Sequence, residues 1–149
     1  MKIAIGADHN GVAFKAALKR HLEEGGHTCI DVGPEGADSV DYPDFAFAAS
    51  ELVAGGEAER GILICGSGIG MSMAANKVPG IRAALCLNEE AARLCRAHND
   101  ANILTLAGWQ TGNDDVYLIV DRFLATPFDG GRHARRVDKI MAYERMHTK

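Results

Sequence analysis

The sequence predicts an α/β protein built on a parallel β-sheet, because short apolar segments alternate with stretches of helical periodicity along the whole chain. Five apolar segments are predicted to be strands, and a Gly, Asp or Asn follows each: Lys2–Ala7, Thr28–Val32, Gly61–Cys65, Ile81–Leu87 and Asn102–Ala107. Strands joined through helices pair in parallel, with right-handed crossovers. The 149 residues contain no internal repeat or linker, so we expect a single domain over residues 1–149.

Helical segments separate the predicted strands. Val12–Leu22 has apolar residues at helical spacing. A second helix is predicted to begin at Asp41 or Tyr42, with Pro43 in its first turn, and to run to about Ala54. A short helix of small residues follows the third strand. Three more helices are predicted over Glu89–Ala97, over Asn113–Ala125 and from about Arg132 onward.

The composition is that of an ordinary globular protein and narrows the possible partners. Hydrophobic residues make up 47% of the chain and charged residues 24%, and the net charge is −4. This charge gives no nucleic-acid footprint, and no apolar run has the length of a membrane span, so we expect neither nucleic acid nor a membrane as a partner. No signal peptide is evident, and the four cysteines show no C-x-x-C or zinc-finger spacing, so the expected compartment is cytoplasmic.

A cysteine and a glycine-rich loop follow the third predicted strand, at the edge of the sheet where α/β proteins bind ligands. Cys65 ends the strand, and residues 66–70 read G-S-G-I-G. The free N–H groups of such a loop at a helix start suit an anion or a developing oxyanion. The loop lacks the acidic residue of a dinucleotide site and the lysine of a P-loop. It therefore predicts either a site that uses the Cys65 thiol or a tight turn with a buried cysteine.

Other polar residues offer acid, base or phosphate-binding groups. Asp8 and His9 follow the first strand, where Asp8 either acts on a sugar hydroxyl or caps the next helix. His98 lies near the amino end of the fifth strand, so a structural role is expected unless it reaches a site across a subunit interface. Arg132 and Arg136 share one helix face and either clamp a phosphate or belong to a solvated basic helix.

Six segments that span nearly the whole chain carry a family resemblance. They are 6–11 (GADHNG), 41–44 (DYPD), 61–70 (GILICGSGIG), 75–83 (ANKVPGIRA), 98–102 (HNDAN) and 130–137 (GGRHARRV). Together, and in this order, they resemble the ribose-5-phosphate isomerase B family, whose relatives include galactose-6-phosphate and allose-6-phosphate isomerases. The resemblance implies a Rossmann-like three-layer α/β/α sandwich. It also implies a homodimer or homotetramer with active sites between subunits, so that His98 reaches a site on another chain.

The resemblance further implies a reaction. It is the metal-free interconversion of an aldose phosphate and a ketose phosphate through a cis-enediolate, with ribose 5-phosphate and ribulose 5-phosphate as the default pair and with no cofactor. Cys65 corresponds to the base that moves a proton between C2 and C1. The backbone donors that would stabilise the enediolate oxygen belong to Gly66, Gly68, Ile69 and Gly70.

The resemblance assigns the remaining roles to side chains. Ser67 would hydrogen-bond the moving hydroxyl or carbonyl oxygen. His98 would open the furanose ring, with Asp8 assisting on the ring oxygen. The substrate ligands are His9, Arg132 and Arg136 for the phosphate and Tyr42 and Asn99 for the sugar.

Two departures from the family pattern concern the substrate. Trp109 stands where family members commonly carry an arginine that can contact phosphate, and Glu89–Glu90 add negative charge near a possible rim of the site. A tetrose or hexose phosphate is therefore the alternative substrate. Two other functions stay open, namely a non-catalytic sugar-phosphate sensor and a redox role for Cys65 with Cys86 or Cys95.

Overall fold

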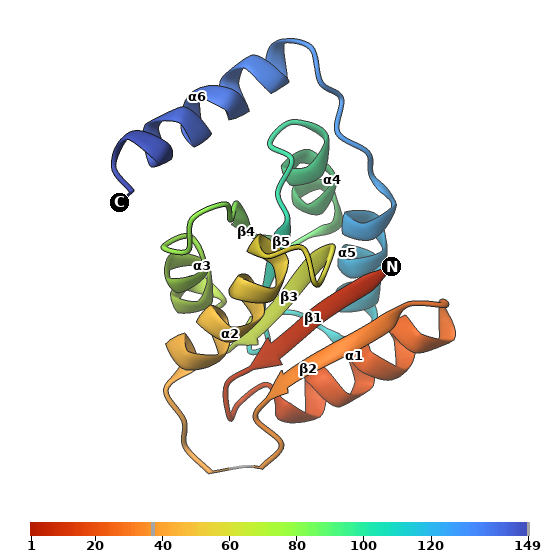
Figure 1. The fold of residues 1–149 in the computed structure, drawn as a ribbon. Helices are drawn as coiled ribbons and strands as arrows, with labels where there is room; N and C mark the ends of the chain where they lie inside the picture. Colours follow the sequence, from red (N-terminus) through yellow and green to blue (C-terminus); the bar gives the residue numbers. More distant parts are fainter. Residues whose placement is uncertain (37, 149) are drawn as a thin grey trace.

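The computed structural model describes residues 1–36 and 38–148 and confirms the α/β fold (Figure 1). Strands and helices alternate along the chain as the periodicity predicts. The elements are β1 (Lys2–Ala7), α1 (Val12–Glu24), β2 (Thr28–Gly33), α2 (Tyr42–Ala54), β3 (Arg60–Cys65), α3 (Ile69–Ala75), β4 (Ala83–Leu85), α4 (Glu89–Ala97), β5 (Ile103–Ala107), α5 (Asn113–Ala125) and α6 (Arg132–Met146).

The five strands form one parallel sheet in the order β2-β1-β3-β5-β4. The chain leaves β1 toward one side of the sheet and returns through β2 and α2 to β3 on the other side of β1. This makes a topological switch point between β1 and β3, where α/β sheets open a crevice at the carboxyl edge. In the register, Ala7 lies opposite Ile64 and Cys65 lies opposite Ala107, so three strands end side by side there.

Two hydrophobic clusters fill the space on the two faces of the sheet. One joins the sheet to α1, α4 and α5, and the other joins it to α2 and α3. The alternation of a strand sends successive side chains to opposite faces: Ile62 and Ile64 of β3 enter the first cluster, while Leu63 and Cys65 enter the second. Figure 1 shows these helices on both sides of the sheet, which confirms the three-layer sandwich.

The fourth strand is shorter than the predicted Ile81–Leu87, because β4 pairs with β5 over only three residues. Ile81 and Cys86 are buried, at 3% and 1% exposure, but they enter the core from the turns that flank the strand. On the outer side of β4, the Asn76 side-chain amide donates to the carbonyl of Ala83 and accepts from its N–H, at 3.0 and 2.8 Å. The side chain thus occupies backbone groups that an edge strand otherwise leaves open.

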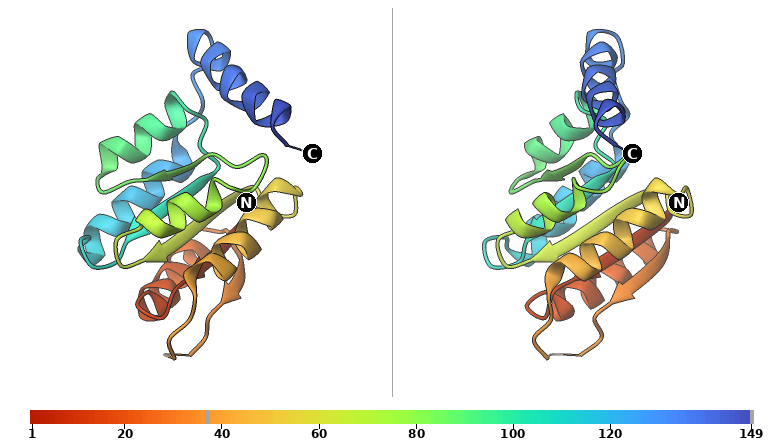
Figure 2. Two further views of the ribbon diagram at one scale, coloured as in Figure 1. Left: turned by 90° about the vertical axis from the view of Figure 1, so that its left-hand side faces the viewer. Right: turned by 60° about the vertical axis from the view of Figure 1, so that its left-hand side comes forward.

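Helix α6 stands apart from the sheet and the other helices (Figures 1 and 2). Val137 is its buried residue, whereas Ile140, Tyr143 and Met146 are 56%, 66% and 80% exposed. An apolar stripe of this kind on a helix normally packs against another surface. In the described residues, no helix is both long enough and apolar enough to cross a membrane.

Candidate active site

Cys65 lies at the carboxyl end of β3, at the switch point of the sheet. It is 6% exposed, and its Sγ accepts a hydrogen bond from the N–H of Gly68 at 3.1 Å. The thiol therefore ends a rigid, buried strand and faces the backbone of the glycine-rich loop.

The glycines of the loop are required by close contacts. A Cβ atom at Gly66 would lie 2.4 Å from the ring of Trp109, and one at Gly70 would lie 2.4 Å from the ring of Tyr42. Gly68 has a φ of +74°, in the left-handed region that favours glycine. Two aromatic rings thus rest directly on the loop backbone, which fixes the path of the loop beside Cys65.

A cavity of about 390 Å³ opens between the loop and the aromatic rings. It brings together most of the residues predicted to act on the sugar. Its lining consists of Asp8, Tyr42, Cys65, Gly66, Ser67, Ile69, Gly70, Met73 and Trp109. Except for Met73, each of these residues was singled out in the sequence. The contacts of Met73 and Trp109 with the cavity could not be found from sequence, because both depend on how α3 and the turn after β5 pack.

The carboxylate of Asp8 is not a helix cap. Its Oδ1 accepts from the N–H of Asn10 at 2.9 Å, while Gly11, at the N-cap of α1, makes no side-chain cap. The side chain is buried in the wall of the cavity, since Asp8 is 7% exposed. The hydroxyl of Ser67 accepts from the N–H of Ile69 at 3.2 Å. Both oxygens have hydrogen-bonding capacity left for a bound sugar.

Six predicted residues do not line this cavity: His9, Gly68, His98, Asn99, Arg132 and Arg136. His9 lies next to Asp8 in sequence, but the Nδ1 of its ring accepts from the N–H of Val40 at 3.2 Å. His98 ends α4, whose first residue follows β4 at the carboxyl edge of the sheet. The helix therefore carries His98 toward the opposite edge, as the sequence rule predicts. Arg132 and Arg136 lie on α6.

His98 instead stacks on His133, a residue that the sequence analysis did not single out. The ring centroids are 4.1 Å apart and the ring planes differ by 8°. Partial burial lowers the pKa of His133, and the neighbouring His98, Arg132 and Arg136 lower it further. The two rings come from elements 35 positions apart in sequence, so only the tertiary structure shows the pair.

The two acidic residues at the start of α4 are paired with arginines. Glu89 binds Arg122 at 2.8 Å, and Glu90 binds Arg93 at 2.5 Å. Neither residue lines the cavity at Cys65. Their charge is therefore balanced locally, and the expected negative rim of the site is not formed within this chain.

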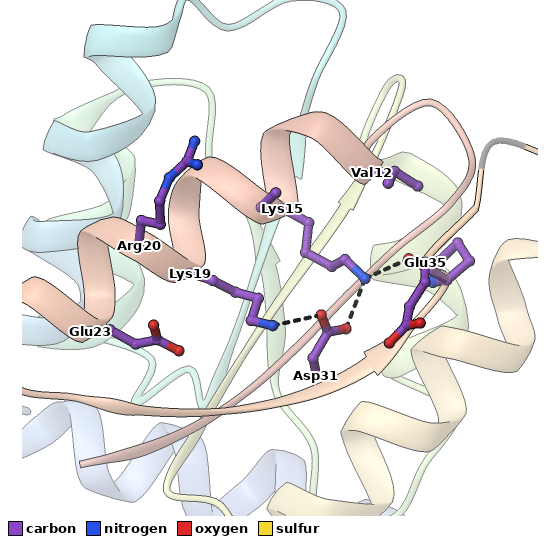
Figure 3. A pocket seen from close by; sticks show the side chains of 9 residues that line it. Val12, Lys15, Lys19, Arg20, Glu23, Asp31 and Glu35 are labelled. Carbon is purple, nitrogen blue, oxygen red and sulfur yellow. Dashed lines mark hydrogen bonds and ion pairs between the residues drawn. The ribbon is translucent and has the colours of Figure 1, made fainter.

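A second cavity, of about 350 Å³, lies between α1 and the end of β2 (Figure 3). Its wall holds Lys15, which is 3% exposed and binds Asp31 at 2.8 Å, and Lys19, which binds the same carboxylate at 3.1 Å. Burial raises the pKa of Asp31, but hydrogen bonds from Lys15, from the N–H of Gly33 and from Lys19 outweigh burial and lower it overall. These groups satisfy one another, so the cluster ties α1 to β2.

The other buried cysteines lie on the far side of the sheet from Cys65. The sulfur atoms of Cys86 and Cys95 are 3.8 Å apart and belong to the cluster under α4 and α5. Cys65 belongs to the cluster under α2 and α3. The sheet thus separates Cys65 from both candidate resolving cysteines, and a redox pair with either one has no support in this arrangement.

Comparisons with known proteins identify the family and agree with the fold. A family described as Ribose/Galactose Isomerase matches residues 3–140. The ribose-5-phosphate isomerase B of Escherichia coli K12 is 45% identical over 143 residues, which make up 96% of each chain. The solved structure of the Clostridium thermocellum enzyme of this name is 51% identical, with a TM-score of 0.97 over 99% of this chain and 100% of that one. The Mycoplasma genitalium enzyme, solved with bound ribulose 5-phosphate, is 44% identical, with a TM-score of 0.94 over 97% and 96%.

Proposed function

The chain belongs to the ribose and galactose isomerase family, and we propose that it interconverts ribose 5-phosphate and ribulose 5-phosphate through a cis-enediolate. One observation carries the proposal. The Sγ of Cys65 lies against the glycine-rich loop, 3.1 Å from the N–H of Gly68, in the wall of a cavity that Asp8 and Ser67 share. The relative with bound ribulose 5-phosphate supports this choice of sugar.

In this proposal Cys65 is the base that carries a proton between C2 and C1. The proton leaves carbon while negative charge develops on the neighbouring oxygen. The first N–H groups of a helix have no partner within the helix, so the N–H of Gly70 is available to receive that oxygen. The N–H of Ile69 donates to Ser67 Oγ and joins it when that hydroxyl turns toward the substrate. Hydrogen-bond donors can stabilise the developing charge here, so the reaction as proposed uses no metal and no other cofactor.

The site becomes complete when a second copy of the chain supplies His98. Arg132 and Arg136 would bind the phosphate from α6, and His98 would open the furanose ring with Asp8 assisting. The assembly is then a homodimer, or a homotetramer made of two such dimers. Its support is the exposed apolar stripe of α6, together with exposed Ile69 and Met73 at the rim of the cavity, at 54% and 66% exposure.

The proposal further places the enzyme in the cytoplasm, as one domain over residues 1–149.

Trp109 decides how firmly the enzyme selects among sugar phosphates. Its ring covers Gly66 and is 71% exposed, where an arginine would add a phosphate contact. A tetrose or hexose phosphate is the alternative substrate, and initial rates over C4 to C6 aldose and ketose phosphates rank the candidates.

Solvent exchange tests the roles of Cys65 and His98 separately. Ribulose 5-phosphate has no furanose form, because its O5 is esterified, so exchange of its C1 proton in deuterated water needs the base but no ring opening. Cys65→Ala should lose this exchange. His98→Gln should keep the exchange but lose turnover of ribose 5-phosphate, which is mostly cyclic. Cys29→Ala, a substitution on β2 away from the cavity, should keep both activities.

All exchange assays contain EDTA, and NMR follows the loss of the proton signal. Full exchange by Cys65→Ala would show that another group is the base. No exchange by the unaltered protein with any tetrose, pentose or hexose phosphate would favour the non-catalytic sensor.

A further inference from the structure

A cluster of potential metal ligands lies outside the cavity at Cys65. The side chains of His98, Asp129 and His133 each offer one ligand atom, and these atoms all lie within 4.8 Å of one another. Two of the residues have no role in the reaction proposed above. In the residues that the structure describes, this is the one group of three or more such side chains close enough to share an ion.

The backbone holds the three residues in place, although they come from three segments. The N–H of Asp129 donates to the carbonyl of Ala97 at 2.9 Å, which ties the segment before α6 to the end of α4. The N–H of His98 donates to Leu94 at 2.9 Å within the same helix end. The stacked rings keep His133 beside His98, and rotation about the side-chain torsions would break the stack and turn one nitrogen of each ring toward a shared ion.

The donor set is two imidazoles and one carboxylate. Zinc binds such ligands at about 2.0–2.2 Å, so the ligand atoms of a tetrahedral site lie roughly 3.4 Å apart. The cluster is within about 1.5 Å of that spacing at its widest. Nitrogen donors select first-row transition metals over Mg²⁺ and Ca²⁺, which prefer oxygen ligands. A site with three protein ligands also leaves one position for water or for an oxygen of another molecule.

We propose that His98, Asp129 and His133 bind one divalent transition-metal ion per chain, of which Zn²⁺ is the representative. The bound ion inhibits the isomerase. A coordinated imidazole has given its lone pair to the metal and cannot take up or release a proton with the substrate. The inhibition rests on the proposed function, because it assumes that His98 opens the sugar ring. Metal binding does not depend on that assumption.

Direct titration of the EDTA-treated and desalted protein tests the binding. Zn²⁺ should bind with a stoichiometry of one per chain in calorimetry, and Co²⁺ should give the visible absorption of a tetrahedral complex. Asp129→Asn and His133→Asn should each weaken binding at least about tenfold. Asp121→Asn is the matched control, because Asp121 also pairs with a histidine, His21, at 2.7 Å, but in the described residues this pair belongs to no group of three ligands close enough to share an ion. The Asp121→Asn variant should bind Zn²⁺ as the unaltered protein does. Mg²⁺ should not bind at the site of the unaltered protein.

The proposal is overturned if the unaltered protein binds no Zn²⁺, or if Asp129→Asn and His133→Asn bind it unchanged. Turnover of ribose 5-phosphate should fall as the site fills, recover with EDTA, and resist Zn²⁺ in Asp129→Asn. If Zn²⁺ inhibits Asp129→Asn and His133→Asn as strongly as it inhibits the unaltered protein, the inhibiting ion binds elsewhere, for example at the Cys65 thiol. That result would overturn the inhibitory role of this site. A protein that binds Zn²⁺ at this site but isomerises no sugar phosphate would refute the proposed function and leave the metal site standing.

Discussion

Substitution of Gly68 by alanine tests whether the glycine-rich loop holds its shape for the reason that the structure gives. Gly68 combines a φ of +74° with a crowded side, because a Cβ atom would lie 2.4 Å from the Cδ1 of Leu85 and 3.1 Å from the backbone of Leu106. Gly26 has a similar φ of +88° and no atom within 4 Å of such a Cβ. A comparison of Gly68→Ala with Gly26→Ala therefore separates the cost of backbone strain from the cost of the missing space for a Cβ atom.

The expected loss of stability follows from these two terms. A left-handed conformation costs an L-residue about 1–2 kcal/mol, which should be the whole effect of Gly26→Ala. Gly68→Ala adds the cost of overpacking, typically about 1–3 kcal/mol. The free energy of unfolding should therefore fall by about 2–5 kcal/mol for Gly68→Ala, which is more than the loss expected for the control Gly26→Ala.

Urea denaturation followed by circular dichroism measures both variants, at one protomer concentration because an oligomer's stability depends on it. Gly68→Ala should also lower kcat roughly 10- to 100-fold, because the added Cβ should displace the loop and with it the backbone N–H groups proposed to stabilise the enediolate oxygen. Gly26→Ala should leave kcat unchanged. If the two variants unfold within about 0.5 kcal/mol of each other, the close contacts at Gly68 do not constrain the loop.

Three other predictions follow from single residues. Asp31→Asn should lower stability at pH 7; because the folded-state pKa of Asp31 is lowered, this stabilisation is full above its unfolded pKa of about 3.9 and disappears as the pH falls through the folded value. Urea titrations at pH 7 and pH 2.5 should show the difference from the unaltered protein shrinking, and a constant difference would contradict the role of the lysines. Trp109→Arg should lower KM for ribose 5-phosphate with little change in stability, because the ring is 71% exposed; an unchanged KM would show that the missing arginine does not weaken phosphate binding. Arg136→Ala should raise KM about 10- to 100-fold, whereas Arg135→Ala, one position away on the helix, should not; equal effects would indicate a general charge effect and no phosphate clamp.

Sequence periodicity predicted the elements that have strong local signals. The bounds of β1, α4 and α5 match the prediction, and at α4 the cap explains why: Asn88 accepts a hydrogen bond from the N–H of Ala91 at 2.8 Å. The strand β4 was predicted too long because Ile81 and Cys86 are apolar and buried, although the register with β5 covers only Ala83–Leu85. Burial is visible in a sequence, but pairing depends on where the neighbouring strand ends.

In the candidate site, too, some features could be predicted from the sequence and others could not. Asp8 and Cys65 could be placed together from sequence, because each follows a strand at the same edge of a parallel sheet. The rings of Tyr42 and Trp109 rest on Gly70 and Gly66 through contacts between segments far apart in the chain, and no local pattern encodes such contacts. His133 next to His98 is a third example, since the angle at which α6 leaves the body determines it.

The geometry of the elements also explains why a single chain does not complete the proposed site. Helix α4 begins at the carboxyl edge and carries His98 about 13 Å along its axis, toward the edge where β5 begins. Cys65 ends a six-residue strand that spans roughly 20 Å in the opposite sense. Within one chain the sheet therefore holds the proposed base and the proposed ring-opening residue apart. In the described residues, no acidic side chain forms an ion pair with Arg132 or Arg136. Both the distance and the free positive charge are accounted for if α4 and α6 of one chain serve the cavity of another.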